Sequence, residues 1–171
     1  MSPVLKLTEL AARFPTSSMV LGGLAEDNMQ VFRTYQSIRV AAPAELVWRT
    51  VRDFHDFSWS ETISSCEAVG DHSGDVVGAR RLLNAAFAET LIEHNDGTYT
   101  MRYSIDDGPS PVSVGDVENY VGCLQLRPIT HDDTTFAEWT SSWKSDDDAA
   151  VAFCGGIYNA LLSELAEHHR R

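Results

Sequence analysis

Glu118 is the carboxylate best placed for acid or base chemistry, because it precedes a strand with a strong alternating pattern. In the run VENYVGCLQLR (117–127), Tyr120, Gly122, Leu124 and Leu126 occupy every second position. Successive strand residues face opposite sides, so Glu118 shares the face of Tyr120 if the alternation extends back to it. A desolvated glutamate has a raised pKa and can act as a general acid or base. A solvated glutamate at a strand start is the competing interpretation.

Arg81 and Glu89 form a second pair that could do chemistry. They lie symmetrically about a turn centred near Ala85, so they can face each other across a hairpin. On a wet face such a pair stabilises by only about 0–1 kcal/mol. If the shared face points inward, the pair instead predicts a polar anchor for a carboxylate or carbonyl of a ligand.

Metal and cofactor chemistry find no support in the sequence. The 6 histidines are scattered, and none stands at metal-ligand spacing beside a second ligand. Neither a nucleophile-elbow sequence nor a glycine-rich phosphate loop is present. The 3 cysteines, Cys66, Cys123 and Cys154, lack the close pairing of zinc or redox motifs and are interpreted as reduced, buried thiols. We therefore expect no metal and no cofactor.

Seven strand-like segments must position these side chains. Turn signals separate them, and the short connections predict an antiparallel meander. After the first strand, Pro43 opens a helical stretch, AELVWRTVRDF (44–54), and a second short helix is expected behind it. The strand-like runs are FRTYQSIRV (32–40), ISSCEAV (63–69), VGARRLL (77–83), AETLIEH (88–94), TYTMRYSI (98–105), 117–127 and TFAEWTSSW (135–143).

A long helix is predicted at the end of the sequence, from the aspartates at 146–148 to the cationic residues at 168–171. Its apolar stripe includes Cys154, Ile157 and Leu161, and it needs a sheet to cover it. The pair Gly155–Gly156 costs about 1 kcal/mol per residue relative to alanine. The pair is explained either by close packing of the helix or by room left for a cavity.

The order of strand, two short helices, six strands and long helix resembles the polyketide cyclase/dehydrase and lipid-transport superfamily, also called START-like, helix-grip or SRPBCC proteins. The resemblance covers about residues 34–168. It implies an α+β helix-grip fold, in which a seven-stranded curved antiparallel sheet wraps around the C-terminal helix and a cavity. The similar stretches are 40–48, 51–54 with Trp59, 77–81 with Glu89, 103–120, and Glu138–Trp139.

Aromatic side chains are the main candidates for the wall of that cavity. Trp139 and Trp143 share one strand face, where they either fill the core or contact a ligand. The hydroxyls of buried tyrosines need partners, which a cavity or the sheet margin can supply. Trp59 is expected near the cavity mouth. The candidate ligand-binding residues are Trp59, Arg81, Tyr103, Tyr120, Trp139, Trp143, Cys154 and Ile157, with Glu118 the candidate catalytic residue.

Three functions fit this cavity. We expect a carrier or sensor that binds a small hydrophobic or amphipathic molecule, because apolar strand faces are plentiful and convergent catalytic groups are not. One alternative is an enzyme of the cyclase or dehydratase type, using Glu118, Tyr120 or Arg81 on a folded poly-carbonyl substrate. Another is a protein-interaction or chaperone-assisting module.

Length and charge set the remaining expectations. The 171 residues suffice for one core, and a net charge of −12 makes nucleic acid an improbable partner. Neither a signal sequence nor stable membrane insertion is expected, so we predict a cytoplasmic monomer or homodimer. Residues 1–28 are interpreted as an appendage with a short amphipathic helix, and 29–171 as a single domain.

Overall fold

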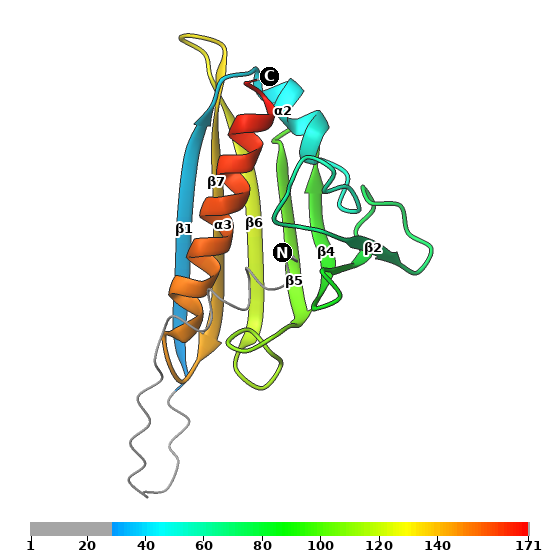
Figure 1. Ribbon diagram of the computed structural model, residues 1–171, viewed down its shortest axis with the longest axis vertical. Coiled ribbons are helices and arrows are strands. Elements are labelled where there is room, and N and C mark those ends of the chain that lie inside the picture. The colour runs from blue at the N-terminus through cyan, green and yellow to red at the C-terminus, as the bar shows by residue number, and fades with distance from the viewer. Residues whose placement is uncertain (1–28, 171) are drawn as a thin grey trace, which may run out of the picture.

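The alternating segments form seven strands of one antiparallel sheet in the computed structural model, which describes residues 29–170 (Figure 1). The strands follow the order β1-β7-β6-β5-β4-β3-β2 across the sheet. The predicted appendage at 1–28 lies outside the described residues. The strands are β1 (Gln30–Val40), β2 (Cys66–Val69), β3 (Arg80–Leu83), β4 (Phe87–Asn95), β5 (Thr100–Asp107), β6 (Glu118–Ile129) and β7 (Thr134–Ser145).

Short turns dictate the antiparallel pairing of neighbouring strands. Asn84 and Ala85, with φ of 52° and 51°, turn the chain between β3 and β4. The side chain of Asn95 accepts hydrogen bonds from the backbone N–H groups of Gly97 and Thr98 and so closes the β4–β5 turn. Asp133, with φ of 55°, lies in the β6–β7 hairpin. The predicted meander is therefore confirmed, with strand ends shifted by at most three residues.

The first strand leads into the short helix α2 (Ala44–Val51), and Pro43 stands at its N-cap as its fixed φ favours. Val47, Trp48 and Val51 form the buried face of α2. α2 and the turns of segment 52–65 together occupy the place expected for two short helices. This irregular segment covers the inner face of β3 and β4, where the backbone oxygen of Phe54 accepts a hydrogen bond from Arg81.

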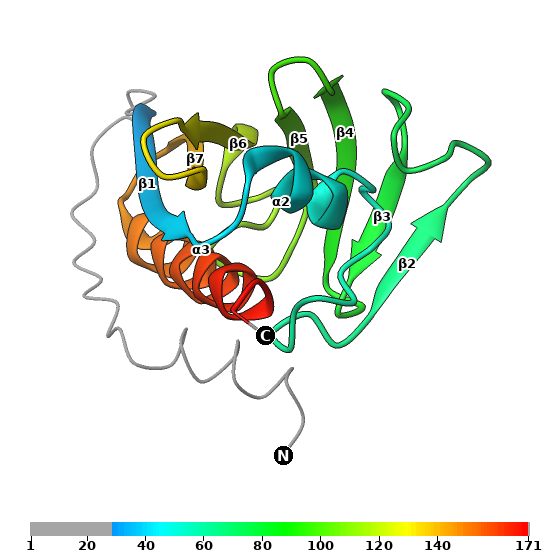
Figure 2. The same cartoon turned by 90° about the horizontal axis from the view of Figure 1, so that it is seen from above.

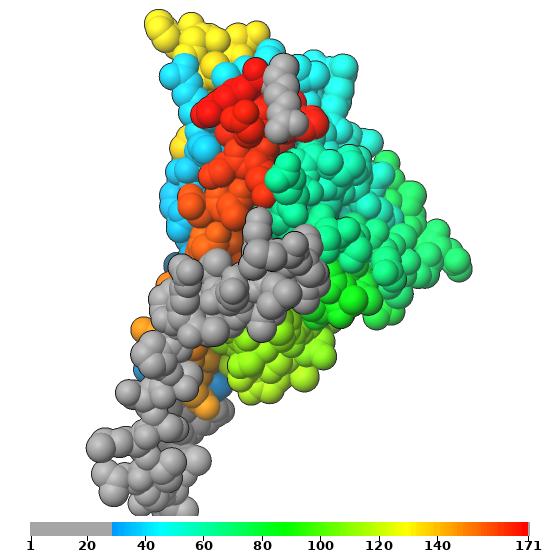
Figure 3. All heavy atoms as spheres, viewed as in Figure 1, coloured from blue at the N-terminus to red at the C-terminus, as the bar shows by residue number. Residues whose placement is uncertain are grey.

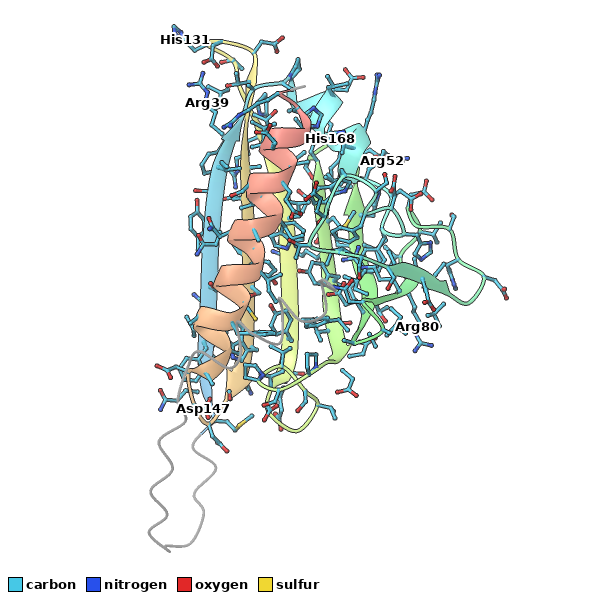
Figure 4. All side chains as sticks on the ribbon, in the orientation of Figure 1. Arg39, Arg52, Arg80, His131, Asp147 and His168 are labelled. Atoms are coloured by element: carbon cyan, nitrogen blue, oxygen red, sulfur yellow. The ribbon has the colours of Figure 1, made fainter. Side chains whose placement is uncertain are left out.

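The long helix α3 (Ala149–His168) crosses the concave side of the sheet beside β1, β7 and β6 (Figure 2). A residue that precedes the helix caps its first turn. The carboxylate of Asp147, labelled in Figure 4, accepts a hydrogen bond from the backbone N–H of Ala149. A β-carbon on Gly155 would lie 3.1 Å from Oγ1 of Thr34 on β1. Gly155 therefore serves close packing of helix on strand, the first of the two explanations for the glycine pair.

The apolar face of α3 is buried in the core of the protein. Leu161, Leu162 and Leu165 are at most 3% exposed. The helix is long and apolar enough to cross a bilayer by length and composition, yet half of its most apolar window is buried by the rest of the fold. α3 is accordingly the core helix of a helix-grip fold, as expected.

Candidate functional site

A cavity lies between the inner face of the sheet and α3. Its free volume is about 40 Å³, which is room for a few water molecules. Aliphatic and aromatic side chains make most of the wall, and polar atoms enter it in two groups. The wall consists of Phe57, Ile63, Arg81, Leu83, Phe87, Glu89, Tyr103, Ile105, Val112, Tyr120, Trp139, Phe153, Cys154, Ile157, Tyr158 and Leu161.

The first polar group is a cluster of three tyrosine hydroxyls supplied by three elements. Tyr103 is on β5, Tyr120 on β6 and Tyr158 on α3, and all three are buried. The hydroxyl of Tyr158 lies 3.0 Å from that of Tyr103 and 2.6 Å from that of Tyr120. On β7, the indole N–H of Trp139 donates to the Tyr103 oxygen at 2.9 Å. Four elements thus bring one hydrogen-bonded network to the cavity wall.

Gly122 on β6 makes room for this network. It pairs with Tyr103 in the sheet, and a β-carbon on Gly122 would lie 2.3 Å from Cζ and 2.6 Å from the hydroxyl oxygen of Tyr103. Any other residue would collide with the ring. A glycine inside a strand marks such a close approach, and here it lets the Tyr103 ring lie flat across its neighbour.

Burial keeps the three phenols protonated. Removal from water raises the pKa of Tyr103, Tyr120 and Tyr158 well above the usual value of a phenol, because the phenolate form would lose its hydration. The hydroxyls are therefore neutral hydrogen-bond donors throughout the physiological pH range.

The second polar group is the ion pair of Arg81 and Glu89, which face each other across the β3–β4 hairpin as predicted. The shared face points inward, since the two side chains are only 3% and 6% exposed. Nε and Nη2 of Arg81 both lie 2.7 Å from Oε2 of Glu89, and Nη1 donates to the backbone oxygen of Phe54. Burial raises the pKa of Glu89, against the opposing effect of the Arg81 charge.

Aromatic rings hold the guanidinium of Arg81 in place. Its Cζ lies 3.6 Å from the ring centroid of Phe54 and 4.7 Å from that of Phe57. Such stacking is worth about 2 kcal/mol when the cation is desolvated. Arg80, the preceding residue, is exposed and labelled in Figure 4, so the strand alternation alone separates a surface arginine from a buried one.

Segment 52–65 is tied to α3 over the end of the cavity that it covers. The carboxylate of Glu164 accepts hydrogen bonds from the side chain of Ser60 and from both the backbone N–H and the hydroxyl of Thr62. In the space-filling view, the red end of α3 directly adjoins the cyan to green surface of the chain after α2 (Figure 3). This contact fixes the position of the wall residues Phe57 and Ile63.

Six of the eight sequence-predicted ligand-binding residues line the cavity, and two do not. Trp143 points inward but stacks between Phe32 and Tyr120, where it fills the core. Trp59 is buried against Phe57 outside the wall, rather than standing at a mouth. The six that line the cavity are Arg81, Tyr103, Tyr120, Trp139, Cys154 and Ile157.

The expectation that Glu118 faces the interior is wrong. The pairing of β6 with β7 shifts between Glu118 and Val121, and Asn119 in this bulge has φ of 53°. The extra residue breaks the alternation, so Glu118 is exposed although Tyr120 is buried. Glu118 can therefore make no contact in the cavity.

Tyr158 is the functional candidate that sequence reasoning missed. It follows Cys154 by four residues on the inner stripe of α3, and that spacing was a signal that could have found it. Phe87 and Phe153, whose rings stack with centroids 6.4 Å apart, were missed as well. Phe87 begins β4 directly after a turn. No preceding strand residue therefore shows which face of the sheet its side chain occupies.

Other reactive groups do not gather in this site. Burial raises the pKa of the Cys154 thiol to about 12, so it is protonated and poorly nucleophilic at neutral pH. Within residues 29–170, no group of three or more histidine, cysteine or acidic side chains is close enough to hold a metal ion. Among the described wall residues, Glu89 is the only one with a carboxylate.

Comparison with known proteins gives a consistent result. Residues 31–170 match the sequence model of the family described as polyketide cyclase/dehydrase and lipid transport. A Nitrosospira multiformis protein of known structure is 49% identical, with a TM-score of 0.79 over 81% of this chain and 99% of the other. A Thermobifida fusca protein is 26% identical, with a TM-score of 0.69 over 80% and 92%.

A more distant similarity shows the fold alone. Norcoclaurine synthase from Thalictrum flavum, solved with dopamine and hydroxybenzaldehyde, is 13% identical, with a TM-score of 0.63 over 89% of this chain and 95% of the enzyme. No functionally curated protein sequence has significant similarity to the chain.

Proposed function

The chain belongs to the polyketide cyclase/dehydrase and lipid-transport family, and we propose that it binds one small amphipathic molecule in the cavity under α3, as a carrier or sensor. The observation that supports this is a mostly apolar wall with two separate polar groups, the tyrosine cluster and the Arg81–Glu89 pair. Ligand sites combine these features, since apolar contacts supply affinity and a few polar atoms fix orientation.

The ligand gains much of its space by displacing wall side chains. A free volume of about 40 Å³ is far below the roughly 300–1,000 Å³ of sites for drug-sized molecules. Ile105 and Ile157 are the wall residues that remain partly exposed. We place the entrance between them, where side-chain rotation opens the wall without breaking the sheet.

Passive binding fits the cavity better than catalysis of the cyclase or dehydratase type. That alternative needs a free acid or base, and Glu118 is exposed. Glu89 lies in the wall, but Arg81 holds one of its oxygens at 2.7 Å. Proton transfer by Glu89 would require breaking a buried ion pair, whose loss costs about 3–5 kcal/mol.

We propose the domain extent, cellular compartment, oligomeric state and partners that were expected from the sequence. Residues 29–171 act as a single domain in the cytoplasm, as a monomer or homodimer without nucleic acid. The net charge of −12 supports the last point, because an acidic surface repels phosphate backbones. The protein-interaction alternative gains no support from the cavity, which it would not use.

A fluorescent probe and two cysteine variants test the proposed function. N-phenyl-1-naphthylamine, a neutral apolar dye, should bind with micromolar Kd and quench the tryptophan emission of the protein. Cys154→Leu should weaken dye binding at least 10-fold, because the larger side chain fills the cavity. Cys123→Leu is the matched control, since Cys123 lies on β6 outside the wall.

Failure of the dye to bind, or equal binding to both variants, would overturn the proposal. Native mass spectrometry of the purified protein should in addition show a co-purified small molecule that Cys154→Leu no longer retains.

A further inference from the structure

The strand β1 forms a long free edge of the sheet (Figure 1). It pairs with β7 over all of its 11 residues, and no backbone hydrogen bond within residues 29–170 reaches its other side. Every second residue of such a strand presents an N–H and a C=O group that lack a partner strand. The opposite edge, β2, has only 4 residues. β1 is therefore the edge that can accept a further strand.

β1 lacks most of the features that protect an edge strand from pairing. It is long, contains no proline, has no bulge against β7 and carries no charge on its inner face. Thr34 marks that inner face, since it lies against Gly155 of α3. On the outer face, Val31 and Tyr35 are 59% and 53% exposed. An exposed edge with large apolar side chains favours strand pairing.

We infer that β1 pairs antiparallel with β1 of a second copy of the chain, with Tyr35 at the two-fold axis, so that two sheets join into one. Tyr35 is the middle residue of Gln30–Val40, and pairing about it uses the whole strand. A two-fold contact of this kind is closed and gives a dimer rather than a fibre. β1 supplies no residue to the cavity wall, so the inference stands whether or not the cavity binds a ligand.

The inner-face side chains of β1 match in this register. Phe32 lies opposite the partner's Ile38, and both residues are only partly buried within one copy. Thr34 lies opposite the partner's Gln36, which pairs one polar side chain with another. Cross-strand pairs of this kind are the unit of sheet stabilisation. The dimer thus covers apolar surface that the single copy leaves exposed.

The outer-face side chains also match, and like charges do not lie directly opposite each other. Arg33 lies opposite the partner's Ser37. Val31 lies opposite the partner's Arg39, whose aliphatic stem can cover it. The charge of Arg39, labelled in Figure 4, is already paired with Asp132.

Other registers fit less well. A slip of one residue would place inner-face side chains opposite outer-face ones. A slip of two residues in one direction places Arg33 opposite the partner's Arg39, and like charges directly opposite are destabilising. The same slip in the other direction sets Phe32 opposite the partner's Gln36. The side chains therefore favour the register centred on Tyr35.

α3 and the charge of the chain are compatible with a second copy beside β1 (Figure 2). Ala152 and Asn159 lie one turn before and one turn after Gly155, so they share its face toward β1. Both are exposed and both side chains are short. β1 itself has two arginines and no acidic residue, whereas the whole chain has a net charge of −12. Two acidic copies therefore repel each other less at this edge.

Sedimentation equilibrium of the full-length protein should show a dimer with a micromolar Kd. Tyr35→Lys puts two lysines opposite each other at the axis and should weaken dimerisation by at least about 5-fold. Val114→Lys is the matched control, because it adds the same charge at an exposed apolar residue outside β1 and should keep the wild-type Kd.

Two variants at one position test the register. Ser37→Glu should tighten the dimer about 5-fold through two equivalent pairs with the partner's Arg33, and Ser37→Arg should weaken it about 5-fold. Within one copy, Ser37 pairs with Glu138 on β7. An effect that acted only through the stability of one copy would therefore follow the opposite order.

Oxidative cross-linking locates the axis. Opposite residues of antiparallel strands have Cα atoms about 4.5–5.5 Å apart, within the range for a disulfide, so Tyr35→Cys should give a covalent dimer. Ser37→Cys should not, because the two copies of residue 37 would be offset by about 13 Å along the strands.

Two results would overturn the inference. A wild-type protein that stays monomeric at millimolar concentration would leave the free edge to a strand of another protein. A dimer that Tyr35→Lys does not weaken, and that Tyr35→Cys does not cross-link, would use a different surface.

Discussion

The two halves of the sheet are covered in different ways. β1, β7 and β6 are long strands of 11, 12 and 12 residues, and one regular helix packs across them. β2 and β3 have four residues each, and the irregular segment 52–65 covers this side. The first half is held by apolar packing. The second is held by polar side chains that bind backbone atoms, such as Arg81 to Phe54 and Asn84 to Ser64.

This difference predicts how each half of the sheet loses stability when a residue is replaced. An apolar interface loses stability gradually, as methyl groups are removed. A buried polar contact fails abruptly, because removal of one partner leaves the other desolvated and unpaired. The following predictions test this contrast.

The largest effect is expected in the irregularly covered half. Arg81→Met should destabilise the protein by about 3–5 kcal/mol in urea unfolding at pH 7, because Glu89 is left buried without its partner. The double variant Arg81→Met/Glu89→Leu should be about as stable as the wild type or more so, since apolar side chains replace the whole pair. A single variant within about 1 kcal/mol of the wild type would show that water reaches the pair.

In the helix-covered half, the cost should depend on how completely a leucine is surrounded. Leu165 is fully buried, whereas one side of Leu161 faces the cavity. Leu165→Ala should cost about 3–4 kcal/mol and Leu161→Ala about 2 kcal/mol, the middle and lower parts of the range for buried leucines. Denaturant midpoints at constant m-value measure both. The reverse order would mean that α3 packs more tightly over the cavity than around Leu165.

Gly122→Ala should have an intermediate effect, because its β-carbon would collide with the Tyr103 ring. Overpacking of this kind costs about 1–3 kcal/mol. The indole N–H signal of Trp139 should shift at the same time, since the Tyr103 hydroxyl must move. Gly115→Ala is the control, as its nearest neighbour atom would be 3.8 Å away. An unchanged indole signal would contradict the geometry of the tyrosine cluster.

The smallest effect is expected at Asp96, an exposed carboxylate that joins the β4–β5 turn to Arg52 and to the indole of Trp48. These hydrogen bonds lower the pKa of Asp96 to about 2. A lowered folded-state pKa gives stability above the unfolded value near 3.8 that is lost as the pH falls toward 2. Asp96→Asn should therefore flatten the stability curve between pH 4 and pH 2, and change it by less than about 1 kcal/mol. Equal slopes for the wild type and Asp96→Asn in this range would show that the contacts of Asp96 are broken in solution.

The sequence was sufficient for the fold and for part of the site, because strand alternation is a local property. Period two correctly placed Tyr120, Leu124 and Trp139 inward and set Arg81 opposite Glu89. It failed at Glu118, where the bulge at Asn119 inserts one residue. Asparagine tolerates positive φ more readily than most residues, so Asn119 itself was the available signal.

Strand alternation could not predict which inward-facing side chains line the cavity and which fill the core. Trp139 and Trp143 share one face, yet the first lines the cavity and the second fills the core. The distinction depends on where α3 crosses the sheet and on Phe32 from β1 at the far end of the chain. Contacts of that range leave no periodic trace in the sequence.

The pairing of β1 with β7 has a consequence for how the protein is made. Gln30 at the start of β1 pairs with Ser145 at the end of β7, so β1 lacks its partner until the chain has been translated as far as residue 145. At roughly 5–20 residues per second, the ribosome delivers that partner on the order of 10 s later. α3 follows still later. The nascent chain therefore holds β1 unpaired while the other strands emerge, and the sheet is completed only after β7 has been synthesised.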